Sequence, residues 1–296
     1  MLIVNSDSMD VYRNLAIEEY LMERSSGPVL FFWQSDCAVV MGKNQNPWRE
    51  CRLDLMRAEG VPAARRISGG GAVYHDAGNL NYCVIVDRRS YREEQVYRIV
   101  LRALERFGIR AEKTGKSNLS VDGLKFSGNA FCFRKDHALH HGTLLLQTDL
   151  NRLNRYLGSM LEGIETHAVA SVPAQVMNLQ LDRGELILAL EEEFRAEYGG
   201  DHLIHNSDAD LEPAALEPML RRQNSADWIW GATPQFVLEQ SGFRVEVQRG
   251  IVTAATGEYA DTRWVGKVFQ EVAFLLLRCS TVISGIPNQG PVLMRF

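Results

Sequence analysis

The spacing of apolar residues predicts the first elements of the chain. An opening helix is expected over about residues 10–23, and Gly27 and Pro28 end it, because both residues interrupt a helical pattern. Residues 30–33 and 38–41 are short, continuous apolar runs. Runs of this length, separated by a turn, predict two short buried strands.

A second helix has a clearer apolar face. Ser90 and Glu93 have the spacing of a capping box at its start, and Gly108 is expected to stop it. Its apolar positions recur at helical spacing: Val96, Val100, Leu104 and Phe107.

Strands predominate between residues 72 and 146. Apolar runs of strand length occur at 80–86, 124–132 and 143–146. Beyond residue 149 the pattern becomes helical again. One further helix is expected to end at Gly199-Gly200, and its apolar face carries Ile187, Leu188, Leu190 and Phe194.

The C-terminal part is predicted to form a small separate unit. The polar and acidic stretch over residues 202–218 is expected to be a connecting segment. Residues 228–231, an aromatic cluster, follow it. Strands are then expected near 243–247 and 251–255, and a helix near 265–277.

Composition agrees with this organisation. The chain has 296 residues, of which 46% are hydrophobic, and this is enough for a large core. We therefore predict an α+β (mixed α/β) fold with a larger domain over residues 1–225 and a small accessory domain over 226–296. The formal net charge of −5 argues against wholesale binding of nucleic acid.

The sequence also suggests a location. It contains no apolar run long enough for a signal peptide or a membrane span. The five cysteines are odd in number and include no C-x-x-C pair, which argues against a disulfide framework. We expect a cytoplasmic protein with mostly buried, inert thiols.

The most informative segment is a glycine loop at residues 69–71, preceded by Arg65 and Arg66 and followed by His75. Without Cβ atoms such a loop admits a ligand closely, and its successive N–H groups can turn toward one anion. Arginine offers a planar fork that matches phosphate or carboxylate. The spacing fits neither a dinucleotide fingerprint nor a P-loop. A flexible hairpin is the alternative, but the flanking residues favour an anion site.

A lysine lies early in a largely apolar strand. Lys125 follows a tight turn at Asp122-Gly123. A lysine in such a strand either extends to solvent or meets a negative charge. An exposed edge residue is the ordinary alternative. The small residues that follow, Ser127, Gly128 and Ala130, leave room for a ligand to lie against the strand.

Two histidines are adjacent at positions 140 and 141. In a strand, the side chains of His140 and His141 point to opposite faces, so they cannot easily ligate one metal ion. The chain also lacks the H-E-x-x-H and Cys/His spacings of zinc sites. We expect one of the two histidines to pack beneath a ligand pocket.

Together these segments resemble the lipoate–protein ligase A family. That family has a loop R-x-S-G-G-G-A-V-[FY]-H-D-x-G-N, a strand K-x-S-G-x-A and a motif H-H-G-T-L-L, in this order. The matching residues here are 66–79, 125–130 and 140–145, and stretches at 39–48 and 228–236 resemble two further family segments. The resemblance spans most of residues 10–240.

The resemblance implies a fold and a reaction. The fold is the catalytic core that biotin–protein ligases and class II aminoacyl-tRNA synthetases share, with a small accessory domain. In the reaction, lipoate or octanoate attacks the α-phosphate of ATP with Mg²⁺, giving the acyl-adenylate. A lysine of a partner then takes the acyl group. The implied partners are lipoyl domains of 2-oxoacid dehydrogenase E2 subunits or the glycine-cleavage H protein, and neither nucleic acid nor a membrane is expected.

Family positions also imply roles for individual residues. Those expected to hold ATP or the adenylate are Arg66, Gly71, Ala72, Val73, Tyr74 and Lys125. Those expected to contact lipoate are Lys125, His75, Ala130 and His140. For the apolar tail, Trp33, Val73 and Ala130 are candidates by their neighbourhood to these motifs. Lys125 is the expected catalytic residue. Because negative charge grows near it in both steps, it acts electrostatically rather than as a nucleophile.

Two segments depart from the family pattern. Where the family has G-R-N-D, this chain has Gly-Lys-Ser-Asn at 115–118, so Asn118 replaces the aspartate that would help to hold Mg²⁺. A basic run of the ligases corresponds here to residues 161–179, which contain no lysine or arginine. This resembles the lipoyltransferase branch. The alternative function is therefore a transferase of the same fold that uses a pre-activated acyl donor without its own ATP step.

Three other interpretations are disfavoured. Thioester-forming octanoyltransferases carry a cysteine at positions that correspond here to 117–121 or 162–164, and neither segment contains one. Cys132 is expected in the core. A non-catalytic binding protein is disfavoured by the retained Lys125 and glycine loop. Biotin ligation is disfavoured because the G-R-G-R-x-G loop is missing.

Overall fold

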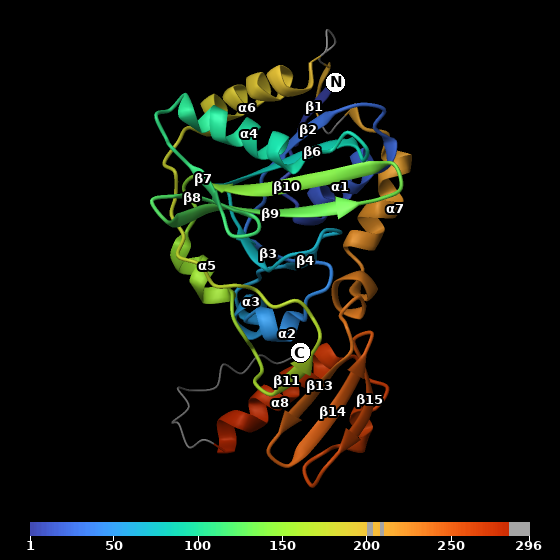
Figure 1. Ribbon diagram of the computed structural model, residues 1–296. Coiled ribbons are helices and arrows are strands. Elements are labelled where there is room, and N and C mark those ends of the chain that lie inside the picture. The colour runs from blue at the N-terminus through green and yellow to red at the C-terminus, as the bar shows by residue number, and fades with distance from the viewer. Residues whose placement is uncertain (200–203, 208–209, 284–296) are drawn as a thin grey trace.

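An eight-stranded sheet is the largest element of the computed structural model, which describes residues 1–199, 204–207 and 210–283 (Figure 1). In spatial order its strands are β12 (Ile204–Ser207), β1 (Leu2–Asn5), β2 (Val29–Trp33), β6 (Asn79–Asp87), β10 (His137–Leu145), β9 (Leu124–Phe133), β8 (Asn118–Val121) and β7 (Glu112–Thr114). β1 is parallel to β12 and β2, and the other neighbours are antiparallel.

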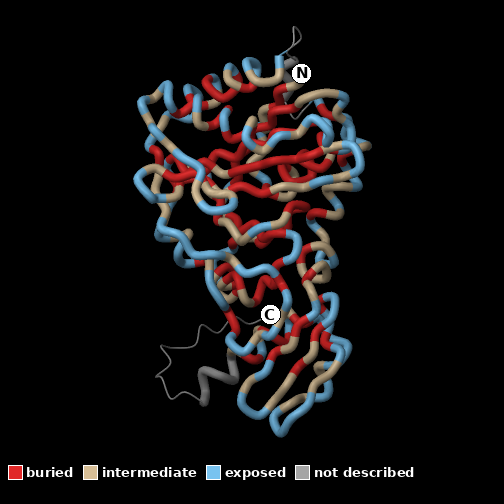
Figure 2. Tube along the Cα trace, viewed as in Figure 1, coloured by how far each residue is buried: buried red, intermediate tan, exposed pale blue. Residues whose placement is uncertain are grey.

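Helices cover both faces of this sheet (Figure 1). They are α4 (Glu93–Glu105) and α6 (Arg183–Tyr198) on one face, and α1 (Val11–Arg24) with α7 (Pro213–Gln223) on the other. Alternation along β2 explains why both faces are apolar. Leu30 and Phe32 join the core beneath α4 and α6, whereas Phe31 and Trp33 join the core beneath α1. Figure 2 shows the resulting buried centre.

Two smaller sheets lie below the large sheet in the view of Figure 1. One contains β4 (Ala63–Arg65), β3 (Ala38–Met41) and β5 (Val73–His75), and the other contains β11 (Ile164–Thr166), β13 (Phe236–Gln240), β14 (Phe243–Gln248) and β15 (Ile251–Thr256). The remaining helical segments are α2 (Pro47–Glu50), α3 (Leu53–Ala58), α5 (Leu150–Tyr156), a π-helical turn (Asp227–Gly231), a 3₁₀ turn (Thr262–Trp264) and α8 (Phe269–Ile283).

The predicted mixed α+β fold is confirmed, and so is the opening helix, which Asp10 caps by accepting a hydrogen bond from the Tyr12 N–H. The strands predicted at 30–33 and 38–41 both exist, but they belong to different sheets. Within the described residues, no helix is long and apolar enough to cross a membrane.

The capping box predicted for α4 is wrong. The helix begins at Glu93 after Arg92, which makes no side-chain capping bond, and the Ser90 hydroxyl instead donates to the carbonyl oxygen of Asp87. The local turn that follows β6 takes Ser90 away from the helix end. The apolar periodicity predicted the buried face of the helix correctly, because α4 buries Val96, Val100 and Leu104.

The predicted face of α6 is partly wrong. Leu186, Ala189, Leu190 and Phe194 are buried, whereas Leu188 is 61% exposed. The sheet and α4 lie on the side of Leu186, so the helix turns Leu188 outward. The helix ends at Tyr198, its C-cap Gly199 has φ of 64°, and Gly200 lies outside the described residues.

The connecting segment predicted over 202–218 is also partly wrong. Residues 204–207 form β12, which pairs with β1 at the edge of the large sheet, and α7 already begins at Pro213. The pairing partner is about 200 positions away in the sequence, so no local pattern indicates it. Residues 202–203 and 208–209 lie outside the described part of the chain.

The C-terminal strands and helix are found close to their predicted positions, as β14, β15 and α8. The sequence did not indicate β13. It also did not indicate that β11, from the middle of the chain, pairs with β13 in the same sheet. The division into residues 1–225 and 226–296 stays a prediction, and positions 284–296 of it are not among the described residues.

Candidate active site

A cavity of about 560 Å³ lies beside the glycine loop. Strands β9 and β10 supply one wall, and α1 and β2 supply another through Glu18 and Trp33. Most site residues predicted from the sequence line this cavity: Arg66, Gly71, Ala72, Val73, His75, Asn118, Lys125 and Ala130. The fold thus brings segments more than 50 positions apart to one place.

Two predicted residues do not line the cavity. Tyr74 lies between Val73 and His75 in β5, so its ring points the other way and packs near Tyr156. His140 is buried on the α4 side of the large sheet, where its Nε2 lies 3.0 Å from Asn129 Oδ1. Its neighbour His141 is the histidine of the pair that reaches the cavity.

The glycine loop is held open by close backbone packing. Gly70 has φ of 85°, a conformation that favours glycine. A Cβ on Gly42 would lie 2.1 Å from the Gly70 carbonyl oxygen, so only glycine fits at position 42. These contacts determine the backbone path that faces the cavity.

Arg66 holds this loop by hydrogen bonds to its residues. Its guanidinium donates to Ser68 Oγ at 3.0 Å and to the carbonyl oxygens of Gly69, Gly71 and Val40 at 2.5, 2.8 and 3.2 Å. Burial lowers the pKa of Arg66 to about 10, so the group is still charged at neutral pH. Its contacts stiffen the loop and place a positive charge beneath it.

Lys125 lies near the start of β9, opposite the loop. Its side chain runs past Gly128, where an added Cβ would lie 3.1 Å from Nζ, so the missing side chain there makes room for it. Burial, and then the charge of Arg66, lower the pKa of Lys125. A cation held at this cost in a cavity indicates an anionic or strongly polar ligand.

A strap, residues 168–177, lines the cavity with residues 169–172 and is attached at two points. Ser171 Oγ accepts hydrogen bonds from the Ala72 N–H and from Gln45 Nε2, both at 3.0 Å. The backbone of Lys125 pairs with Gln175 and Met177, each at 2.9 Å. No local sequence pattern indicates this role, because the partners of the strap come from distant segments.

His75 lines the cavity and has one unpartnered ring nitrogen. Its Nδ1 accepts a hydrogen bond from Asn79 Nδ2 at 2.9 Å, so in the neutral ring Nε2 carries the proton. Burial, followed by the charge of Arg66, lowers the pKa of His75 to about 3, which keeps the ring neutral. Nε2 is buried and has no protein partner. The ring also stacks on Trp33 at 5.3 Å.

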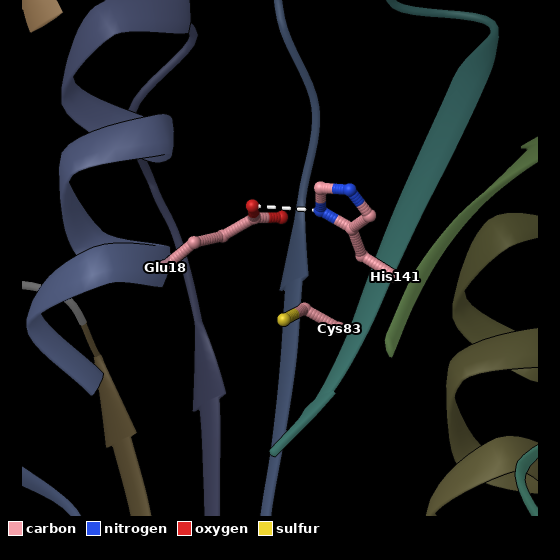
Figure 3. A group of neighbouring side chains, drawn as sticks. All are labelled: Glu18, Cys83 and His141. Atoms are coloured by element: carbon pink, nitrogen blue, oxygen red, sulfur yellow. Dashed lines mark hydrogen bonds and ion pairs between the residues drawn. The ribbon is translucent and has the colours of Figure 1, made fainter. Parts of the chain in front are cut away.

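A second polar group lines the cavity on its α1 side. Glu18 Oε2 lies 2.7 Å from His141 Nδ1, and Cys83 lies beside the pair (Figure 3). Sequence analysis missed Glu18. The available signal was an acidic residue among the apolar positions of the opening helix, a position that is rarely buried without a partner.

The cavity offers little to Mg²⁺, which prefers carboxylate and other oxygen ligands. Among the described lining residues the only carboxylate is Glu18, and both of its oxygens are engaged, by Trp33 and by His141. Asn118 contributes an amide instead of a carboxylate. The residues present therefore do not form a ready Mg²⁺ site at Asn118.

The fold and the cavity define a class of protein: an α+β protein with a cationic, glycine-rich ligand site. The family model "Lipoyl protein ligase A/B catalytic domain" matches residues 10–194. The mitochondrial lipoyl amidotransferase of Homo sapiens is 39% identical over 81% of this chain and 68% of its own length. The lipoate-protein ligase A of Bdellovibrio bacteriovorus is 38% identical over 78% and 72%.

Solved structures agree in fold. A crystal structure of P. falciparum LipL1 in complex with lipoate has a TM-score of 0.68 at 24% identity, over 98% of this chain and 95% of that one. A structure of lipoate-protein ligase A bound with ATP has a TM-score of 0.63 at 25% identity, over 77% and 96%. This chain belongs to the lipoyl protein ligase A/B catalytic-domain family and is an enzyme of the lipoate ligase and lipoyl transferase type.

Proposed function

We propose that this protein attaches a lipoyl or octanoyl group to the side-chain amine of a lysine on a lipoyl-domain protein. One observation carries the proposal: Lys125 and the glycine loop line one cavity, with Lys125 desolvated and Arg66 braced beneath the loop. This arrangement suits an acyl donor whose leaving group is anionic.

Lys125 has a physical reason to be catalytic. When the acceptor amine attacks the acyl carbonyl, negative charge develops on the carbonyl oxygen and on the leaving group. A cation that is already fixed in a partly water-free cavity stabilises that charge more than it stabilises the ground state. The loop N–H groups and the Arg66 charge act in the same direction.

The acyl chain requires an apolar slot, and the cavity provides one. Leu15, Trp33, Val40, Val73 and Ala130 all line it. His75 also lines the cavity and has an unpartnered Nε2–H, which would suit an oxygen of the acyl donor. We therefore keep Lys125, His75 and Ala130 as lipoate-contacting residues and assign His141 where the sequence suggested His140.

Two forms of the reaction share this site. In the ligase form, the protein makes the acyl-adenylate from ATP, as a relative named for its ligase activity and a structure with bound ATP suggest. In the transferase form, it accepts a pre-activated donor, as a relative named an amidotransferase suggests. A specific observation favours the transferase form: among the described residues the cavity has no free carboxylate for Mg²⁺.

Pyrophosphate release separates the two forms. Purified protein is incubated with ATP, Mg²⁺ and lipoate and without acceptor, and in parallel with synthetic lipoyl-adenylate and a purified lipoyl domain. We expect transfer from the adenylate without release of pyrophosphate. Release would instead establish the ligase form. If neither release nor transfer occurs, the proposed function is wrong.

The acceptor is proposed from the family. A related structure is described as an archaeal lipoylation system of a bipartite ligase and its E2 lipoyl domain. We therefore expect lipoyl domains of 2-oxoacid dehydrogenase E2 subunits, or the glycine-cleavage H protein, as acceptors. Mass spectrometry of each candidate domain after incubation identifies the modified lysine. The cytoplasmic location stays a prediction.

A further inference from the structure

A buried chain of hydrogen bonds begins at the acyl wall of the cavity. The indole N–H of Trp33 donates to Glu18 Oε1 at 3.0 Å, and Glu18 Oε2 lies 2.7 Å from His141 Nδ1. The other ring nitrogen, Nε2, lies 2.6 Å from Ser68 Oγ. We call Glu18, His141 and Ser68 the relay. All three side chains are at least nine-tenths buried.

The relay continues into the glycine loop. Ser68 Oγ accepts a hydrogen bond from Arg66 Nε at 3.0 Å, and the same guanidinium donates to the carbonyl oxygens of Gly69 and Gly71. One end of the chain therefore touches the slot for the acyl tail. The other end holds the loop that faces the anionic part of the donor.

Hydrogen-bond chemistry sets the direction of the relay. A carboxylate only accepts, so His141 Nδ1 carries a proton and donates it to Glu18. Nε2 then accepts from the Ser68 hydroxyl, which is left with a lone pair for Arg66. In this arrangement every polar atom of the relay has a partner, and a buried network that is partly unsatisfied is costly.

Two other roles fit the same residues less well. Glu18, Cys83 and His141 lie close enough for a metal ion (Figure 3), but both nitrogens of His141 are already engaged in hydrogen bonds. The order Ser–His–Glu matches a hydrolytic triad. However, Ser68 is 1% exposed and is not among the residues that line the cavity, so its hydroxyl is not presented to an acyl group.

We propose that the relay couples the two halves of the donor site, which are the acyl slot and the glycine loop. A ligand in the acyl slot fixes the positions of Ser68 and Arg66, and thereby the glycine loop. Each half then binds its part of the donor more tightly when the other half is occupied. Glu18 and Ser68 are then positioning residues that act through His141 and Arg66. Such coupling arises when binding of one ligand orders a segment that the second ligand would otherwise have to order itself. The inference rests on the proposed function.

Calorimetric titration with octanoate and adenosine monophosphate tests the coupling. Each ligand is titrated alone and then in the presence of saturating amounts of the other. We expect octanoate to raise the nucleotide affinity of the wild type by about fivefold or more, the lower end of ordinary coupling. Glu18→Gln is nearly isosteric, but its side-chain amide has only one acceptor oxygen. It therefore cannot accept hydrogen bonds from both Trp33 and His141, as the Glu18 carboxylate does. Ser68→Ala removes the link to Arg66.

Both variants should bring the ratio of nucleotide affinities with and without octanoate close to one. Cys83→Ala is the matched control: it changes packing beside Glu18 and His141 but removes no member of the relay, so the coupling should remain. Amide hydrogen exchange of residues 69–72, with and without octanoate, gives a second measurement if one variant is unstable. Octanoate should protect these amides in the wild type and in Cys83→Ala only.

The outcomes are distinct. Coupling that persists in both Glu18→Gln and Ser68→Ala contradicts the relay. An acyl adduct on Ser68, seen by intact mass after incubation with lipoyl-adenylate, also contradicts it, because Ser68 would then be a nucleophile. A wild type that binds neither ligand contradicts the proposed function itself, whereas binding without coupling contradicts only the relay.

Discussion

Arg65 donates two hydrogen bonds to the carbonyl oxygen of Ile229, at 2.9 and 2.8 Å, and so joins β4 to the π-helical turn before the C-terminal sheet. The same buried guanidinium also donates to Thr233 Oγ1 and to the backbone of residues 42, 43 and 45. Burial lowers the pKa of Arg65 to about 10, which leaves it charged at neutral pH. The first arginine before the glycine loop is therefore structural.

Arg65→Lys should destabilise the protein. An ammonium cannot reproduce the planar fork, so several buried carbonyl oxygens lose their donors, and each such loss costs about 1–3 kcal/mol. We expect the free energy of unfolding to fall by about 3 kcal/mol or more in urea titrations. Arg263→Lys, at a position 88% exposed on its side chain, is the control and should change little. Equal stability of the two variants would contradict this account.

Lys125→Ala should abolish acyl transfer while leaving the fold intact. Removal of a donor that stabilises transition-state charge costs about 100- to 1,000-fold in rate. The measurement is transfer from lipoyl-adenylate to a lipoyl domain, with melting temperature as the check on folding. Lys113→Ala, on the exposed edge strand β7, is the control and should keep its activity. Near-normal transfer by Lys125→Ala would refute the proposed mechanism.

Stability should decrease in acid because of His75. Its pKa is lowered to about 3 in the folded state, mainly by burial, against an ordinary value near 6.5. The unfolded chain therefore binds more protons between these values. Stability is full above about pH 6.5 and falls as pH drops toward 3, by at most about 1.4 kcal/mol per pH unit.

The check is urea unfolding at several pH values from 7 to 4. His75→Phe keeps an aromatic ring beside Trp33 but cannot titrate, so its stability should fall less steeply with acid. His140 has a pKa well below its usual value, also because of burial, and contributes a slope of the same sign. An unchanged slope in His75→Phe would show that His75 is not the titrating group.

Ala130→Leu should weaken binding of the acyl tail. Ala130 lines the cavity and is almost fully buried, so a larger side chain there takes up space in the slot. We expect the affinity for octanoate to fall about tenfold or more, which corresponds to about 1.4 kcal/mol. Adenosine monophosphate lacks an acyl tail and serves as the control ligand, with unchanged affinity expected. Unchanged octanoate binding would place the tail elsewhere.

The sequence alone determined the local elements and the chemical character of the site. The periodicity of α1 and α4, the apolar runs of β6 and β9, the glycine loop and Lys125 are encoded within short windows. Backbone conformation and side-chain spacing depend there on neighbours in the chain. The family motifs also indicated the class of reaction from the sequence alone, because each motif is a continuous stretch of residues.

Only the tertiary structure decided which groups meet. Strand alternation places His140 and His141 on opposite faces, but which face holds the cavity depends on the helices that cover each side of the sheet. The contact of Glu18 with His141 joins positions 123 apart in the sequence. The pairing of β11 with β13 also joins segments that are far apart in the sequence, so no local pattern indicates it. Such contacts arise from packing of the whole chain, so no window of the sequence contains them.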